Sequence, residues 1–383
     1  MQQYIKHYHM VLRTVGPVFV GDGRSLDKKE YIFQKNKGMV LIPDLNKMYQ
    51  GITKKGLERR FTEYLLSNAK NADGSNRWDL GRWFRENNIG SKDYEPWILY
   101  KLDCGDFLQE KGAIEIRTFQ KDAFGKPYVP GTSMKGMLRT ILLANELMND
   151  DSYCKEVKRC IMSAIQNGRN RTFLLKREVN EIENEVLHTL DRVDARGKEV
   201  GKNHAVNDVL SGLIISDSKP ISLERMTLCQ KIDDNVEGER KSLNLLRESV
   251  KPGTDIHFDL TIDSTICPYT IEDIVDAVNC FNESYYNMYL YRFKGIEYPK
   301  TNTVWLGGGS GFFTKTILYA LLGQNKGIDA AVEIFKKTLP AKVSQEHKHF
   351  KDKRIGISPH TLKVTKYQGK SYQMGQCILD IYE

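Results

Sequence analysis

The segment just after residue 250 restricts the possible folds more than any other part of the chain. Lys251-Pro252-Gly253 precedes residues 255–263, in which apolar and polar side chains alternate without a break. Strict alternation predicts a half-buried β-strand. Thr270 and Asp273 then have the spacing of a helix capping box, and apolar residues recur at helical spacing as far as Tyr285. We therefore expect a strand followed by a helix that packs on it.

The order of the predicted elements extends this pattern to the whole chain. After that helix come a short strand, a glycine run, a second helix, a basic stretch and a terminal hairpin near Gln368-Gly369-Lys370. This order is typical of a ferredoxin-like unit, and the first half can be read as the same plan with additions. We predict an α+β fold of two ferredoxin-like (RRM-related) domains, 1–250 and 251–383, with helical insertions in the first at about 44–100 and 150–208.

Composition limits the cellular setting and the class of partner. The 383 residues suit two domains, and 57 basic minus 49 acidic side chains give a net charge of +8. This excess favours an anionic partner such as nucleic acid without requiring one. The seven cysteines form no C-x-x-C pair, and no targeting segment or long apolar run is visible. We expect a cytoplasmic protein that makes no membrane contact.

A first candidate site lies in Val129-Pro130-Gly131-Thr132-Ser133-Met134-Lys135-Gly136-Met137-Leu138-Arg139. Thr132 or Ser133 can cap a helix here, and the free amides of a first helical turn attract anions. Lys135 and Arg139 are one turn apart on the same face. The other interpretation is a capped surface helix with two solvated cations.

A second candidate site lies in Trp305-Leu306-Gly307-Gly308-Gly309-Ser310-Gly311-Phe312-Phe313-Thr314-Lys315-Thr316. Four glycines in five residues cost backbone entropy, so their freedom or lack of a side chain must be needed. Between a strand and a helix, such a loop can line a polyanion with its amides. A P-loop would require glycine where Thr314 stands, which argues against nucleotide hydrolysis. A tight packing turn remains the alternative.

The stretch between residues 336 and 354 is rich in cations. Runs of this kind are usually solvated faces, although beside a nucleic-acid groove they add salt-sensitive affinity. The residues concerned are Lys336, Lys337, Lys342, His347, Lys348, His349, Lys351, Lys353 and Arg354.

Signals for catalysis are few. His7, His9 and His204 are the candidates for the base that a metal-independent ribonuclease needs. The sequence shows no clustered carboxylates and no metal-ligand spacing, so we predict no catalytic residue, no metal and no cofactor. We expect Asp217 to cap a turn.

Taken together, these motifs resemble those of a known family. The order is Gly-Pro-Val-Phe-Val-Gly-Asp-Gly, the two motifs above with Leu-Ile-Ile-Ser-Asp-Ser between them, and a final Met-Gly-Gln-Cys. It resembles the RAMP superfamily of CRISPR-associated proteins over nearly the whole chain. Within that superfamily, the chain is most similar to the family of subunits numbered fifth in the Csm complex of type III-A systems.

The resemblance implies a function. It implies a non-catalytic subunit that caps the 3′ side of the CRISPR RNA (crRNA), contacts neighbouring RAMP subunits and is required for crRNA 3′-end maturation in antiviral defence, with trimming by a recruited host nuclease. The alternative is a RAMP endoribonuclease that cleaves repeat RNA with a histidine base. Related backbone subunits carry a catalytic aspartate after the first strand, but Asp22 and Asp27 do not clearly match it. The RNA-binding residues that the resemblance implies are Gly131, Ser133, Lys135, Arg139, Gly307, Gly308, Gly309, Gly311 and Lys315.

Overall fold

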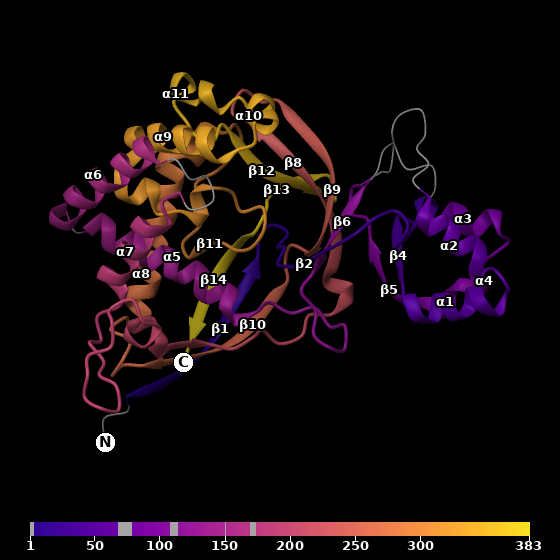
Figure 1. Cartoon of the computed structure of the whole chain (residues 1–383), viewed down its shortest axis with the longest axis horizontal. Helices are drawn as coiled ribbons and strands as arrows, with labels where there is room; N and C mark the ends of the chain where they lie inside the picture. Colours follow the sequence, from indigo (N-terminus) through magenta and orange to yellow (C-terminus); the bar gives the residue numbers. More distant parts are fainter. Residues whose placement is uncertain (1–3, 68–78, 108–113, 150, 169–173) are drawn as a thin grey trace.

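The computed structural model describes residues 4–67, 79–107, 114–149, 151–168 and 174–383, with the side chains of 151–154 left aside. Its fold is a mixed α and β arrangement of two sheets and surrounding helices (Figure 1). The helices are α1 Leu45–Lys54, α2 Glu58–Leu66, α3 Leu80–Glu86, α4 Ser91–Tyr94, α5 Gly131–Asn149, α6 Asp151–Asn167, α7 Lys176–Leu187, α8 Ile271–Met288, α9 Leu318–Thr338, α10 Ala341–His347 and α11 Asp352–Ile355.

Sheet A has the strand order β11-β14-β1-β10-β7, and each strand is antiparallel to its neighbours. The predicted alternation is confirmed in β10, where Phe258 and Leu260 are fully buried while Asp259 between them is exposed. The capping box is also confirmed, because the Thr270 hydroxyl accepts from the Asp273 amide at the start of α8. The strands are β1 Ile5–Thr14, β7 Leu213–Ile215, β10 Asp255–Asp263, β11 Thr303–Trp305 and β14 Gln376–Tyr382.

Sheet B has the strand order β2-β6-β9-β8-β5-β4-β3, and β12 pairs with both β8 and β13. Three of its strands, β2, β5 and β9, were not predicted from the sequence, and the glycines of β2 had suggested a loop instead. The strands are β2 Gly21–Leu26, β3 Ile32–Gln34, β4 Met39–Pro43, β5 Ile98–Asp103, β6 Glu115–Phe119, β8 Met226–Asn235, β9 Arg240–Val250, β12 Thr361–Tyr367 and β13 Lys370–Gln373.

Each sheet takes strands from both sides of residue 250. β1 lies between β14 and β10 in sheet A, and β12 pairs with β8 in sheet B. The sheets therefore do not divide at 250/251, because the first strand of the chain pairs with strands of the last third. The boundary between domains remains a prediction.

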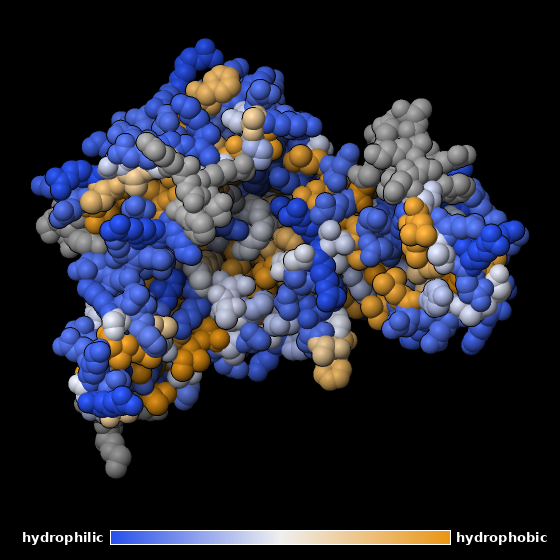
Figure 2. Space-filling model, in the orientation of Figure 1, coloured by the Kyte–Doolittle hydropathy of each residue, from blue (hydrophilic) through white to orange (hydrophobic). Residues whose placement is uncertain are grey.

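The helices form two groups. Helices α5 and α8 pack against each other and against sheet A, with α6, α7 and α9 around them. Helices α1–α4 form a separate lobe with its own core, which includes Phe61, Trp83 and Trp97 (Figure 1). Its helices lie within residues 44–100, and the interpretation of this range as an insertion remains a prediction. Figure 2 shows a mostly hydrophilic surface, with apolar side chains gathered where the lobe joins the rest of the molecule. Among the described residues, no helix has the length and apolar character that a membrane crossing requires.

Candidate nucleic-acid interface

The glycine run Gly307–Gly311 follows β11, which is an edge strand of sheet A. Gly307, Gly309 and Gly311 have φ angles of 80°, 98° and 102°. Side chains rarely tolerate this left-handed region of backbone conformation. The prediction that the run needs the freedom of glycine is therefore confirmed.

Gly307 and Gly308 are needed for packing rather than for an exposed loop. The Gly308 amide donates to the carbonyl of Phe19 over 2.7 Å. A Cβ on Gly307 would lie 2.2 Å from that carbonyl oxygen, and one on Gly308 would lie 2.7 Å from the Phe19 ring. The packing-turn interpretation therefore holds for these two glycines, and the expectation of a free amide is wrong for Gly308.

Gly309 and Gly311 have different surroundings. A Cβ on Gly309 would lie 2.7 Å from Nη1 of Arg247, a residue of β9. Around Gly311 the nearest atom is the Tyr285 hydroxyl oxygen, 3.8 Å from where a Cβ would stand. The backbone of Gly309 thus lies against a guanidinium and Met374, and Gly311 has no close neighbour among the described residues, so this end of the run suits the approach of an anion.

Lys315 stands four residues beyond the run, in the 3₁₀ turn η7, Phe313–Lys315. Desolvation by the surrounding chain lowers the pKa of its amine, and the charge of Arg247 lowers it further. Helix α9 begins only at Leu318, whose amide donates to the Thr316 hydroxyl. The glycine run therefore lies between a strand and a helix, as predicted, although η7 separates it from the start of α9.

The first motif forms the start of α5, as predicted, but its first amides are not free. The Gly131 amide donates to the Asp217 carboxylate over 2.9 Å, and the Ser133 amide donates to the Pro130 carbonyl. A Cβ on Gly131 would lie 2.2 Å from the Ile215 carbonyl oxygen. The Gly131 and Ser133 amides are therefore not free to bind an anion, because the chain after β7 and the Pro130 carbonyl already accept from them. Asp217 was expected to cap a turn, and it caps the start of α5 instead.

The two cations of the first motif differ in their availability. Arg139 forms an ion pair with Asp208, and both side chains are largely buried. Lys135 is half-buried, and no ion pair joins it to a described carboxylate. Burial lowers the pKa of its amine, which the nearby Asp208 opposes. Gly136 is exposed, and a Cβ there would meet no atom within 4 Å. Lys135 and Gly136 are thus the open part of the motif.

The two motifs lie at opposite edges of sheet A. Gly131 contacts the end of β7, and the glycine run follows β11. Four strand spacings separate these edges, or about 19 Å. Helix α5 nevertheless contacts η7, next to Lys315. The motifs can therefore form two contacts on one extended ligand rather than a single pocket.

Arg247 is the residue that the sequence interpretation missed. Its side chain is only 7% exposed, and its Nε and Nη1 atoms have no hydrogen-bond partner among the described residues. The guanidinium lies 5.4 Å from the centre of the Phe19 ring. Burial lowers its pKa, and the charge of Arg117 lowers it further. Only the prediction of strand β9 could have indicated that Arg247 is buried, and this strand was not predicted from the sequence.

The histidines proposed as catalytic bases do not converge. His7 and His9 lie on β1, where His7 contacts the Thr261 hydroxyl and His9 contacts Nδ1 of His257 over 3.0 Å. The rings of His9 and His257 are stacked. His204 instead accepts from the Val206 amide in a separate loop. The structure therefore adds one new pair, His9 and His257.

Asp22 and Asp27 follow the first strand, where related subunits carry a catalytic aspartate. Both carboxylates accept hydrogen bonds from nearby residues. Asp22 accepts from the Thr118 hydroxyl and from the Arg24 amide. Asp27 accepts from the Lys29 amide. Asp22 also lines an open cleft of about 980 Å³ between the helical lobe and sheet B. Both side chains have structural roles at the turns of β2.

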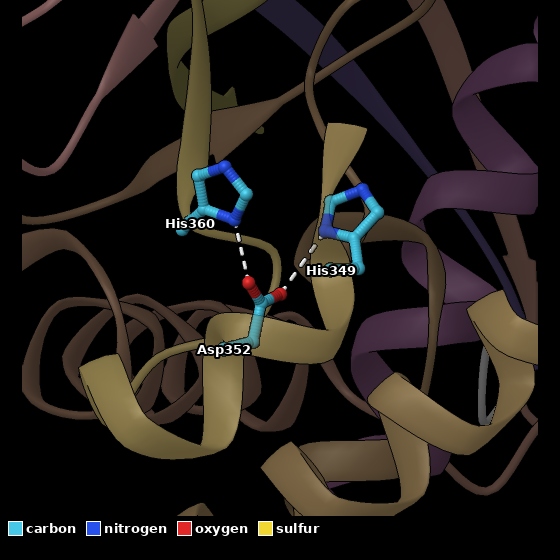
Figure 3. A group of neighbouring side chains, drawn as sticks. All are labelled: His349, Asp352 and His360. Carbon is cyan, nitrogen blue, oxygen red and sulfur yellow. Dashed lines mark hydrogen bonds and ion pairs between the residues drawn. The ribbon is translucent and has the colours of Figure 1, made fainter. Parts of the chain in front are cut away.

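One buried cluster joins an aspartate to two histidines (Figure 3). Asp352 is fully buried, and its two carboxylate oxygens face Nδ1 of His349, at 3.0 Å, and Nδ1 of His360, at 2.5 Å. The Ser358 hydroxyl donates a third hydrogen bond to Asp352. Burial alone would raise the pKa of Asp352, but these hydrogen bonds outweigh it and lower the pKa. These direct hydrogen bonds join η8 (His349–Lys351) and α11 to the segment just before β12, so we interpret the cluster as a structural link.

Comparison with known proteins places these observations in a family. The family model described as the RAMP superfamily matches residues 11–356. The chain belongs to the RAMP superfamily. A relative from Mycobacterium tuberculosis, named CRISPR system Cms protein Csm5, is 27% identical and covers 100% of this chain and 99% of its own. A Streptococcus thermophilus protein of the same name is 28% identical and covers 83% of this chain and 82% of its own.

Solved structures show the same fold. A chain in a structure described as "Cryo-EM structure of Csm-crRNA-target RNA ternary complex in type III-A CRISPR-Cas system" matches with a TM-score of 0.67 and 19% identity, over 97% of this chain and 100% of that one. The "Crystal structure of T.onnurineus Csm5" matches with a TM-score of 0.51 and 16% identity, over 96% and 99%. The α and β architecture is therefore that of RAMP proteins.

Proposed function

We propose that this chain is a non-catalytic RNA-binding subunit of a type III-A CRISPR effector complex. In this role it caps the 3′ side of the crRNA and is required for 3′-end maturation, while a recruited nuclease does the trimming. Neighbouring RAMP subunits are its protein partners, and the cytoplasm of a prokaryote is its location. The names of the relatives, and a structural neighbour that comes from a Csm-crRNA complex, support the assignment to a Csm complex.

The observation that carries the proposal is the position of Arg247 under the glycine run. A buried guanidinium with unpaired N–H groups lies directly below the bare backbone of Gly309, and Lys315 is close to it. Ionised donors form stronger hydrogen bonds to phosphate oxygens than neutral donors do. Contacts of this kind hold the backbone of RNA without reading its sequence. Lys135 provides a second contact at the other edge of sheet A.

The proposed architecture is two ferredoxin-like, RRM-related units. In support, α5 and α8 both pack on sheet A, which has β1 at its centre. The shared sheets mean that the two units would be interleaved rather than joined end to end. We propose that the boundary at 250/251 separates them in sequence only.

Charge reversal within the reconstituted complex tests the RNA-binding role. Lys135→Glu combined with Lys315→Glu should reduce crRNA retention and leave guides that are longer at the 3′ end. Lys326→Glu, an exposed lysine of α9, is the matched control. Retention and guide length equal to those of the wild type in the double variant would count against the proposal.

The second candidate function is an endoribonuclease that cleaves CRISPR repeat RNA. The stacked pair of His9 and His257, with Asp259 4.0 Å from His9, is the observation that favours it. A cleavage assay with the purified chain on repeat RNA in EDTA separates the two functions. Our proposal expects no cleavage, whereas specific cuts that disappear in His9→Ala would establish the enzyme.

A further inference from the structure

Basic side chains form a row across sheet B next to the glycine run. Arg117 of β6 is in register with Arg247 of β9, and Arg247 is in register with Cys229 of β8. Lys231 follows on β8, where the register with β9 shifts between Gln230 and Ile232, and Lys363 of β12 is in register with Asp233 of β8. Side chains in register on neighbouring strands lie on the same face of a sheet. We call Arg117, Arg247, Lys231 and Lys363 the cation row.

The electrostatic effects within the row show that these cations lie close together. Burial lowers the pKa of the Lys231 amine, Lys363, Arg247 and Arg117 each lower it further, and Asp233 opposes them. Like charges that face each other across strands destabilise a sheet. A row of this kind therefore needs a compensating anion.

The described carboxylates compensate only part of this charge. Asp233 pairs with Lys363 over 2.8 Å, and Glu115 pairs with Arg117 over 3.3 Å. Lys231 has no hydrogen bond or ion pair to any residue that the structure describes, and Arg247 has two buried nitrogens without partners. The two central members of the row thus have no direct ion pair with a described carboxylate, and the charge of Asp233, which raises the pKa of both, is shared with Lys363.

We propose that the RNA strand bound at the glycine run continues along the cation row toward Lys363, with Arg247 as its buried phosphate anchor. This inference rests on the proposed function, and it adds the path of the strand and the residues that hold it. The row covers three strand spacings, or about 14 Å, on one face of sheet B. A positively charged surface that follows the backbone is how proteins bind single strands without sequence preference.

Continuity with the glycine run favours RNA over an acidic protein segment. Nη1 of Arg247 lies beneath Gly309, and the charges of Arg247 and Lys315 influence each other. A phosphate at the run would therefore stand over the start of the row. An acidic peptide from a neighbouring subunit would match the charge of the row but not its continuity with the glycine run. The experiment below distinguishes this peptide from RNA.

The experiment uses the full chain, a fluorescently labelled single-stranded RNA that contains 4-thiouridine, and a series of salt concentrations. The row variant is Lys231→Gln, because Lys231 has no described partner whose loss would disturb the fold. Lys315→Glu tests the glycine run, and Lys326→Gln is the control outside both sites. Lys231→Gln should weaken binding about tenfold, and the slope of log K against log salt should fall by about 0.7, the value for one phosphate contact on a single strand.

Crosslinking with the same RNA gives the second readout. Crosslinked peptides from β8 or β12 in the wild type, lost in Lys231→Gln, would support the path. If Lys315→Glu weakens binding while Lys231→Gln does not and only the glycine run crosslinks, the path is wrong and the proposed function stands. If neither variant affects RNA binding, the proposed path and the proposed function are both wrong. A Lys231→Gln defect confined to binding of a neighbouring subunit would assign the row to an acidic protein and overturn the inference.

Discussion

The replacement of Arg247 by methionine should change stability and RNA binding in opposite directions. In the free protein, the guanidinium is buried, has two unpaired nitrogens and faces the like charge of Arg117. A buried donor without a partner costs about 1–3 kcal/mol. Methionine has a similar length and no polar hydrogen, but it loses the contact with the Phe19 ring, worth about 0.5–1 kcal/mol. We therefore expect Arg247→Met to raise the free energy of unfolding by about 1–2 kcal/mol.

The same change should weaken RNA binding, because a charged contact to phosphate is lost. We expect about a tenfold higher Kd and a salt slope smaller by about 0.7. Urea denaturation followed by tryptophan fluorescence measures the first effect, read as a shift in midpoint at constant m-value. Fluorescence polarisation with single-stranded RNA measures the second.

Arg117→Met is the matched control for stability. Arg117 is exposed and pairs with Glu115 at the surface, so its loss should change the free energy of unfolding by less than about 0.5 kcal/mol. If Arg247→Met destabilised the free protein by more than about 1 kcal/mol, the guanidinium would be a satisfied structural group. Unchanged RNA binding in that variant would remove it from the interface.

Other substitutions test single contacts of the fold and the site. Gly309→Ala forces a side chain into a φ of 98° and against Arg247, so it should lower the free energy of unfolding by about 1–3 kcal/mol in thermal denaturation and weaken RNA binding. Gly136→Ala, in the open interior of α5, should instead stabilise the chain by about 0.5–1 kcal/mol, and a loss of stability would show that this surface is not open. Asp217→Ala removes the cap of α5 and should cost about 1 kcal/mol, whereas no change would mean that the Gly131 amide needs no protein partner. Asp352→Asn should destabilise by about 2–4 kcal/mol at pH 7. Because hydrogen bonds lower the pKa of Asp352 in the folded state, its contribution is full above the unfolded pKa of about 3.9 and is lost as the pH falls through the folded value. The difference between wild type and Asp352→Asn in pH-dependent urea denaturation should therefore shrink in acid, and a difference that grows in acid would contradict the assignment.

Elements with a regular pattern could be predicted from the sequence. The alternation in β10, the capping box of α8 and the hairpin of β12 and β13 were all found as expected. The strands β2, β5 and β9 were missed. The two glycines of β2 are typical of a loop, and neither β5 nor β9 shows a clean alternation of apolar and polar residues. In β9 the last five residues, from Leu246 to Val250, are all buried, because β9 lies between β6 and β8 in the interior of sheet B.

The candidate site shows a different limit of sequence analysis. The sequence indicated that glycine was required at Gly307 and Gly309, but not that Phe19 packs on one and Arg247 lies under the other. Likewise, nothing near Gly131 in the sequence indicates that Asp217 occupies its amide. These partners come from distant parts of the chain, so only the tertiary structure shows which backbone groups are free.

The sequence also contained no sign that each sheet combines strands from both halves of the chain. Local patterns suggested two consecutive units, yet β1 pairs with β10 and β14 from the other end of the chain. Long-range pairing of this kind depends on which edges are left open, and no local pattern records it.

A cryo-EM structure of the reconstituted effector complex with its crRNA would test the central claim most directly. We predict a phosphate within about 3 Å of the Gly309–Gly311 backbone and of the Arg247 guanidinium. A glycine run covered by a neighbouring protein, with the RNA elsewhere and Arg247 paired to a carboxylate of that protein, would contradict it.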